Sequence, residues 1–452
     1  MEMTPLNNWI ARKIGVNVSG LTRENIEKYQ LQKLRAILEL VKNKSVFYRK
    51  ALADFKTESL TCLAGLKYIS YTTAEEIRNN PLHFLCVSQD QICRVVTLQS
   101  SGTTGEPKRL YFTKEDQELT IDFFHIGMST LVVPGDRVLI LLPGKLPGSV
   151  GDLLAKGLSR LGVKGIHHGL VTDPGRTLQI MLEQEVNALV GIPTQVLSLA
   201  RYRDEDGNNI PLKLKSVLLS TDYVPQAITR ELQQSWDCRV YSHYGMTEMG
   251  FGGAVECQAL AGYHLREADL YFEIINPVTG LPVPEGEEGE VVFTTLTRQG
   301  MPLIRYRTGD RARFIPEPCP CGTILKRMAP VTGRLNNVCQ VAGGLLTMSD
   351  LDEALFPVAG LLNFQASLSC PEGIDRLTVG VWLNGEANMT AIRKALDTIP
   401  LIHSATKQGN LEVNITILPG GVPASGAKRI ITDLRERGEI NEKIVSGHVA
   451  AS

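Results

Sequence analysis

The sequence has almost no net charge, with a formal value of −1. Its 452 residues include 47 lysines and arginines against 48 aspartates and glutamates. Proteins that bind nucleic acid or an anionic lipid surface usually carry a basic excess or a polybasic cluster. This chain has neither, so we expect no nucleic-acid partner and no membrane partner.

Long apolar runs are missing as well. No uninterrupted apolar stretch approaches the roughly 18 residues that a membrane-spanning helix needs. The first residues, MEMTPLNNWIARKIG, lack the apolar segment of a secretion signal. The chain has nine cysteines, an odd number, and shows no export signal. Both features argue against a framework of disulfides. We therefore expect a cytoplasmic protein.

The rest of the composition is that of a globular protein with a large core. Hydrophobic residues make up 43% and charged residues 21% of the chain, and the length suggests two or three domains. Apolar spacing predicts a helix over residues 26–55. Between residues 116 and 245 short apolar runs alternate with amphipathic segments, which predicts an α/β domain with a mostly parallel sheet. After residue 250 the pattern changes to strands and turns, and from residue 338 it favours a small α+β unit.

The stretch SSGTTGEPKRL, residues 100–110, combines two glycines, four hydroxyl residues and a lysine. Glycines allow the backbone to turn its N–H groups inward, hydroxyls add donors and Lys108 adds a positive charge, as in a phosphate-binding loop. The spacing differs from the common P-loop, in which Gly, four residues and then Gly-Lys-Ser/Thr follow one another. A polar surface loop is the alternative at this point.

The stretch YSHYGMTEMG, residues 241–250, follows a predicted short strand. Open α/β sheets hold their ligands at such strand ends. Glu248 offers carboxylate oxygens of the kind that magnesium takes when it bridges to substrate phosphates. Tyr244 offers a ring that can stack on a flat ligand. A strand-end turn with a surface glutamate is the alternative.

Two shorter patterns come later in the chain. In RYRTGD, residues 305–310, Asp310 follows a Thr-Gly turn. Its carboxylate can accept hydrogen bonds from two sugar hydroxyls, or it can cap the turn. The pair Gly333–Arg334 stands just before the small α+β unit and can bind a ribose or act as a hinge.

A separate group of residues has the chemistry of a metal site. Three thiolates and one imidazole suit tetrahedral zinc, and four protein ligands make such a site structural. Reduced cysteines and a surface histidine are the alternative. The residues are Cys257, His264, Cys319 and Cys321.

Together and in this order, SSGTTGEPK, YGMTE, RYRTGD and GR resemble the motifs of the adenylate-forming superfamily, the acyl-CoA synthetases and their relatives. The chain is most similar to the phenylacetate–CoA ligase-like group, which includes coenzyme F390 synthetase-like members. NKSVFYRKAL near the start and the segment TTAEEIRNNP extend the resemblance over nearly the whole chain. Some members of this group carry a similar Cys…His…Cys-Pro-Cys set, which favours the zinc interpretation.

The resemblance implies a domain organisation. We expect an N-terminal adenylation domain with mostly parallel sheets and a strand-rich subdomain over residues 1–333. A hinge at residues 334–337 and a small, mobile α+β C-terminal domain over residues 338–452 follow it.

The resemblance also implies a reaction. ATP and Mg²⁺ convert a carboxylic acid to an acyl-adenylate and pyrophosphate, and the acyl group then passes to coenzyme A. The catalytic positions are Lys108, Thr247, Glu248, which also holds magnesium, and Lys428. The nucleotide-binding positions are Ser101, Gly102, Thr103, Thr104 and Gly105 for the phosphates, Ser220, Thr221, Tyr244 and Gly245 around adenine, and Asp310 with Arg334 at the ribose.

Three departures from the family pattern affect these assignments. Relatives often carry Gly-Gly-Glu or Gly-Ala-Glu where this chain has Ser220, Thr221 and an aspartate. Relatives have Asp-Asp in the hinge where this chain has Asn336 and Asn337, which removes two charges. The late lysine of Ser-Gly-Lys falls one residue later here, in SGAKR, at Lys428.

The expected function is that of an ATP-dependent acid–CoA ligase for an aryl or arylacetic acid. One alternative is an adenylate-forming enzyme with another acceptor, or a coenzyme F390 synthetase-like adenylyltransferase. The other is a degenerate protein that only senses a nucleotide. The acid is expected near residues 123–128, 191–194 and 242–246, and a homodimer is left open.

Overall fold

The computed structural model describes residues 2–98, 106–204, 206–208, 210–384, 388–426 and 428–435. These residues form two compact units. The first runs up to Asn336 and includes Pro423–Lys428, and the second holds Asn337–Val422 and continues from Arg429.

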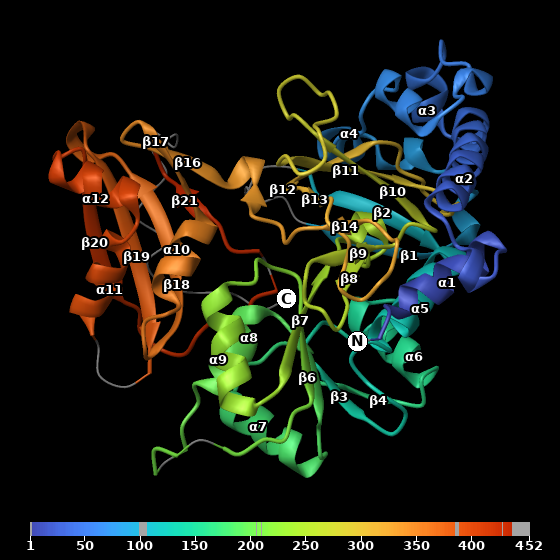
Figure 1. Ribbon diagram of the computed structural model, residues 1–452. Coiled ribbons are helices and arrows are strands. Elements are labelled where there is room, and N and C mark those ends of the chain that lie inside the picture. The colour runs from blue at the N-terminus through green and yellow to red at the C-terminus, as the bar shows by residue number, and fades with distance from the viewer. Residues whose placement is uncertain are drawn as a thin grey trace. The chain divides into compact units, whose positions relative to one another are not determined.

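The described part of the first unit contains a nine-stranded sheet in the order β13-β14-β9-β8-β7-β6-β5-β3-β4 (Figure 1). The strands from β4 to β7 are parallel, and the strands from β7 to β13 run antiparallel to their neighbours. The sheet is therefore mixed, whereas the sequence predicted mostly parallel sheets. Its strands are β3 (Arg137–Ile140), β4 (Lys164–His167), β5 (Ala188–Gly191), β6 (Ser216–Leu219), β7 (Arg239–Tyr244), β8 (Ala254–Glu256), β9 (Tyr263–Leu265), β13 (Phe314–Ile315) and β14 (Arg327–Met328).

Helices cover both faces of the parallel part. Right-handed crossovers place the helix after β3 on one face and the helices that lead to β5, β6 and β7 on the other. Figure 1 shows this arrangement, with α5 and α6 on one side and α7 to α9 on the other. These helices are α5 (Lys114–Met128), α6 (Val150–Ser159), α7 (Pro174–Glu183), α8 (Pro193–Ala200) and α9 (Gln226–Trp236).

Two smaller antiparallel sheets complete the described strands of this unit. One has the order β10-β11-β12-β15, and the other pairs β1 with β2. The strands are β1 (Ile92–Leu98), β2 (Lys108–Thr113), β10 (Leu270–Ile275), β11 (Gly289–Thr295), β12 (Tyr306–Ala312) and β15 (Gly333–Arg334).

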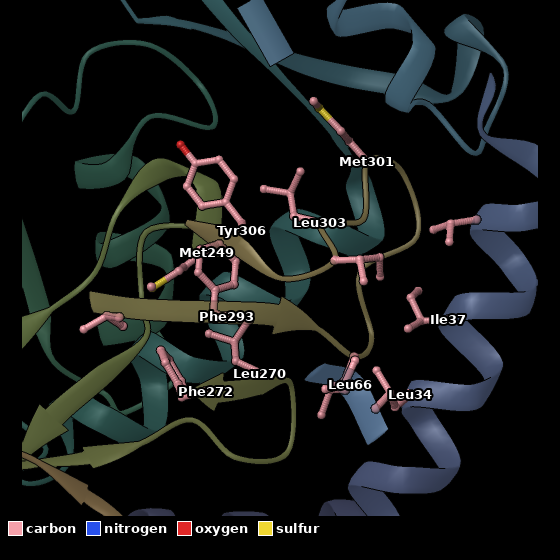
Figure 2. Close-up of a cluster of buried hydrophobic side chains, with 14 of the residues drawn as sticks. Leu34, Ile37, Leu66, Met249, Leu270, Phe272, Phe293, Met301, Leu303 and Tyr306 are labelled. Carbon is pink, nitrogen blue, oxygen red and sulfur yellow. The ribbon is translucent and has the colours of Figure 1, made fainter. Parts of the chain in front are cut away.

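A hydrophobic cluster joins the β10-β11-β12 sheet to three N-terminal helices, α2, α3 and α4. Figure 2 shows Leu34 and Ile37 of α2 facing side chains such as Leu303, with the Tyr306 ring at the edge and its hydroxyl directed away from the labelled residues. The N-terminal helices are α1 (Pro5–Ile14), α2 (Arg23–Lys44), α3 (Val46–Ala51) and α4 (Ala74–Asn79).

The helix predicted over residues 26–55 is divided in the structure. Ser45 separates α2 from α3, because its hydroxyl oxygen accepts a hydrogen bond from the Tyr48 N–H and caps the new helix. The same hydroxyl donates to the His83 carbonyl oxygen at 2.8 Å. A periodic apolar pattern cannot reveal such a cap in the middle of a run.

The second unit, orange to red in Figure 1, has a four-stranded sheet in the order β20-β19-β18-β21 and the hairpin β16-β17. Its α+β character agrees with the sequence prediction. Its elements are β16 (Val338–Val341), β17 (Gly344–Thr347), α10 (Met348–Leu355), β18 (Leu361–Ser369), β19 (Asp375–Leu383), α11 (Met389–Asp397), α12 (Pro400–Lys407), β20 (Leu411–Ile417) and β21 (Ile431–Asp433).

Candidate active site

A lysine and a glutamate that lie far apart in the sequence form a buried ion pair. Lys108 is the first residue of β2, and Glu248 lies in a short 3-10 helix, η6 (Thr247–Met249), directly after β7. The Lys108 ammonium pairs with Glu248 Oε1. It also donates to the Tyr306 hydroxyl at 3.1 Å, and that hydroxyl donates to Glu248 Oε1 at 3.2 Å. Residues of β2, β12 and η6 therefore meet at one oxygen of the Glu248 carboxylate.

Glu248 is ionised despite its burial. Only 4% of the residue is exposed. Burial raises the pKa of this carboxyl, but the Lys108 charge and the hydrogen bonds around it hold the pKa below its usual value. A charged, buried carboxylate beside a lysine suits the binding of a cation and a phosphate together.

A second cation, Arg298, links the two segments that carry the ion pair. Its guanidinium donates to the backbone oxygens of Glu248 and Tyr111, each at 2.9 Å, and stacks 4.3 Å from the centre of the Phe112 ring. Burial lowers the pKa of Arg298. Within the part of the chain that the structure describes, Arg298 forms no ion pair. Arg298 thus ties β2 to the turn that carries Glu248 and adds positive charge.

A second buried carboxylate, Asp310, collects polar partners of a different kind. Only 1% of Asp310 is exposed. Its Oδ1 lies 2.7 Å from Arg334 Nε, opposite it on β15, and 3.9 Å from Lys428 Nζ. Its Oδ2 accepts a hydrogen bond from the Tyr244 hydroxyl at 3.0 Å. Asp310 lies within strand β12, and its carboxylate caps no backbone N–H among the described residues.

Tyr244 keeps its proton. Burial and the neighbouring Asp310 charge raise the pKa of Tyr244 well above its ordinary value. Its ring lies nearly parallel to that of Tyr263, with 6.3 Å between the ring centres. The next residue, Gly245, approaches another backbone closely, since a Cβ there would collide with the Phe251 carbonyl oxygen. Packing therefore requires a glycine at position 245.

The segment after β6 is strained. Thr221 has φ of +83°, a left-handed conformation that β-branched residues rarely adopt. The Ser220 hydroxyl lies 3.0 Å from His243 Nδ1 on the neighbouring strand. Burial lowers the pKa of His243 to about 4, so the imidazole is neutral at physiological pH.

The four candidate metal ligands come together, as expected from the sequence. All are buried, and their ligand atoms lie within 4.8 Å of one another. Cys257 Sγ lies 3.7 Å from Cys319 Sγ, and Cys321 Sγ lies 3.6 Å from His264 Nε2. Zn–S bonds of about 2.3 Å in a tetrahedron place the sulfurs about 3.8 Å apart, so the donor set and the spacing both fit zinc. The cluster lies at the antiparallel side of the large sheet, on β9, after β8 and in the turn between β13 and β14.

Six further predicted residues are those at positions 101–105 and Thr247. Ser101, Gly102, Thr103, Thr104 and Gly105 lie outside the described residues. Thr247 begins η6 beside Glu248. The candidate site residues that can be placed thus fall into the Lys108–Glu248 group, the Asp310 group and the metal cluster, with Ser220 and Thr221 at the end of β6.

Three residues of this region were not singled out from the sequence. Tyr306 had a usable signal, because alternation along a strand places Tyr306, Thr308 and Asp310 on the same side, and these three are the buried ones from 306 to 310. His243 and Arg298 had none, because their partners are distant in the sequence.

No helix among the described residues is long and apolar enough to cross a membrane.

Known proteins resemble this chain in sequence and in fold. The model of the AMP-binding enzyme family matches residues 27–297. A phenylacetate-coenzyme A ligase of Thermus thermophilus is 30% identical over 336 residues, which cover 72% of this chain and 73% of that protein. One of Escherichia coli is 27% identical over 432 residues, covering 91% and 95%. The structure of a 2-hydroxyisobutyryl-CoA ligase in the postadenylation state superposes with a TM-score of 0.76 at 21% identity, covering 90% of both chains. The chain therefore belongs to the AMP-binding enzymes, the adenylate-forming superfamily.

Proposed function

We propose that this protein is an AMP-forming acid–CoA ligase, which activates an aryl or arylacetic acid with ATP and transfers the acyl group to coenzyme A. The observation that carries the proposal is the pair of buried carboxylates with their cations, Glu248 with Lys108 and Asp310 with Arg334. The phenylacetate-coenzyme A ligase names of the relatives in Thermus thermophilus and Escherichia coli support the choice of acid and acceptor.

In the proposed first step the acid carboxylate attacks the α-phosphate of ATP, and pyrophosphate leaves. Magnesium supplies charge that neutralises the phosphates. Glu248 would hold this ion, and Lys108 would leave the ion pair to contact the phosphates together with residues 101–105. Thr247 is the proposed contact to the α-phosphate. Such a site works by fixing charge and geometry.

Asp310 is proposed to accept hydrogen bonds from the ribose hydroxyls. Arg334 and Tyr244 hold its two oxygens from opposite sides, so little rearrangement is needed when a sugar binds. Lys428, 3.9 Å from Asp310, is proposed to reach the acid carboxylate and the α-phosphate. Tyr244, Gly245, Ser220 and Thr221 remain the proposed neighbours of adenine.

The metal cluster is proposed to hold a structural zinc ion. With four protein ligands, such an ion has no open position for catalysis. It would fix the turn at residues 319–321 to β8 and β9, close to Tyr263 and therefore to Tyr244.

ATP–pyrophosphate exchange with a panel of carboxylic acids tests the proposal. We expect exchange with at least one aryl or arylacetic acid, and a thioester when coenzyme A is added. Exchange without a thioester indicates another acceptor. Nucleotide binding without exchange by any acid indicates a sensor and contradicts the proposal.

A further inference from the structure

The carboxyl ends of β6 and β7 carry two polar side chains, Ser220 and His243, whose contact with each other the proposed reaction leaves without a role. The two strands are parallel neighbours, with Leu219 opposite Ser242. Ser220 follows the end of β6, and its hydroxyl lies 3.0 Å from Nδ1 of His243 on β7. Ligands of open α/β sheets bind at this edge.

The other imidazole nitrogen has no partner among the residues that the structure describes. His243 Nε2 is inaccessible to solvent and forms no hydrogen bond within the described part of the chain. The rings of Phe123 and Phe124 lie beside the imidazole, with 6.3 and 6.2 Å between their centres and the centre of the imidazole ring. A buried polar atom without a partner costs about 1–3 kcal/mol, so folded proteins rarely keep one without a use.

The backbone beside this pair is strained at the same edge. Thr221 has φ of +83°, and the Ser220 N–H donates to the Gly191 carbonyl oxygen at 3.1 Å, which continues the sheet up to the strained residue. Such strain gathers at sites that bind ligands. It is an observation independent of the unpartnered nitrogen.

The chemistry of the missing partner follows from the imidazole. Burial lowers the pKa of His243 to about 4, so the ring is neutral and does not call for an anionic partner. The Ser220 hydroxyl can either donate to Nδ1 or accept from it, so Nε2 is a donor in one tautomer and an acceptor in the other. A hydroxyl group satisfies both, and the phenylalanine rings around it suit an aromatic group.

We infer that His243 Nε2, held by Ser220, binds a hydroxyl on the acyl part of the substrate, so that the preferred acids are hydroxyaryl acids and not their unsubstituted counterparts. This inference rests on the proposed function, because it assumes that an acid is activated here. A site built to bond a hydroxyl discriminates strongly against the analogue that lacks it.

The test compares matched acids in ATP–pyrophosphate exchange with the full chain. Phenylacetate is compared with 3- and 4-hydroxyphenylacetate, and benzoate with its hydroxy derivatives. We expect kcat/KM to favour a hydroxylated acid by at least about 10-fold in the natural protein. His243→Phe should reduce that preference by about 10- to 100-fold and leave the KM for ATP unchanged. Ser220→Ala should reduce it by less, and His403→Phe, on the surface of the second unit, should leave it unchanged.

Three outcomes overturn the inference while the proposed function stands. The first is exchange that is equally fast with the unsubstituted acids. The second is a preference that survives His243→Phe. The third applies if His243→Phe does not fold, as judged by a thermal shift with ATP, and is a preference that is unchanged in Ser220→Ala. The absence of exchange with every acid contradicts the proposed function, and the inference fails with it.

Discussion

Tyr306 illustrates how one hydroxyl can organise the two charges of the site. It accepts a hydrogen bond from Lys108 and donates one to Glu248, while its ring stays in the hydrophobic cluster of Figure 2. We expect Tyr306→Phe to lower the exchange rate by about 10-fold, because one well-placed hydrogen bond is worth about 0.5–1.5 kcal/mol or more when charged groups take part. The melting temperature should change little, since the ring remains.

The control for this variant is Tyr68→Phe, which removes the hydroxyl of a residue that is 76% exposed. Exchange kinetics of both variants with the same acid check the prediction. An unchanged rate in Tyr306→Phe shows that Lys108 and Glu248 need no positioning by Tyr306.

Asp310 allows a separate prediction about the nucleotide. Asp310→Ala removes the proposed partner of the ribose and leaves Arg334 without its carboxylate, so we expect a rise of about 10-fold or more in the KM for ATP. The KM for the acid should stay within about twofold. Steady-state kinetics with each substrate varied in turn separate the two effects, and an unchanged KM for ATP argues against ribose binding.

Sequence motifs led to the charged residues of the site but not to their arrangement. Lys108, Glu248, Asp310 and Arg334 stand in recognisable stretches, and the structure brings them together in two groups. The direct contact of Lys108 with Glu248 was not predictable, because the two residues are 140 positions apart and only the tertiary fold brings them together.

At the scale of elements, the large sheet shows which strands a local sequence pattern can predict and which strands it cannot. Strand β6, Ser216–Leu219, is one of the short apolar runs that the sequence shows between residues 116 and 245. The addition of β8, β9, β14 and β13 to the same sheet was not foreseen, because those strands are two or three residues long and pair across the sequence. Short strands carry too little alternation to be assigned from sequence.

The metal cluster allows a prediction about the stability of the antiparallel side of the large sheet. We expect the protein to contain about one zinc ion per chain, and removal of the metal with a chelator under reducing conditions to lower the melting temperature by roughly 5 °C or more. Cys319→Ser should have the same effect, and Cys62→Ser, at an exposed cysteine, should not. A metal-free protein with the melting temperature of the untreated one contradicts the zinc site.

At the scale of the whole molecule, the chain passes between the two units at residues 336–337, 422–423 and 428–429. The sequence suggested only the first of these as a hinge. The segment Pro423–Lys428 belongs to the first unit. There the Gln195 side-chain amide donates a hydrogen bond from Nε2 to the Ser425 carbonyl oxygen at 3.2 Å. Motion of the second unit, which stays a prediction, therefore involves more than residues 334–337.

Lys428, the last residue of the segment Pro423–Lys428, allows a prediction about the adenylation step. We expect Lys428→Ala to slow acyl-adenylate formation by about 10²-fold or more and to spare transfer from a supplied acyl-adenylate. Single-turnover measurements of each step check this, with Lys407→Ala on α12 as the control. Equal slowing of both steps, or of neither, shows that Lys428 is not specific to adenylation.

Asn337→Pro tests the hinge itself. Proline fixes φ near about −65° and removes a backbone donor, so we expect the full two-step cycle to slow more than either step measured alone. Cycle rates equal to those of the natural protein argue against movement at this residue.

The most direct test is the ATP–pyrophosphate exchange rate of Lys108→Ala with an accepted acid, beside the natural protein and Lys114→Ala, an exposed lysine at the start of α5. If Lys108 neutralises phosphate charge during adenylation, its loss lowers exchange by about 10²–10³-fold, while Lys114→Ala keeps the natural rate. A folded Lys108→Ala protein that exchanges within about twofold of the natural rate contradicts the assignment of this site to adenylation.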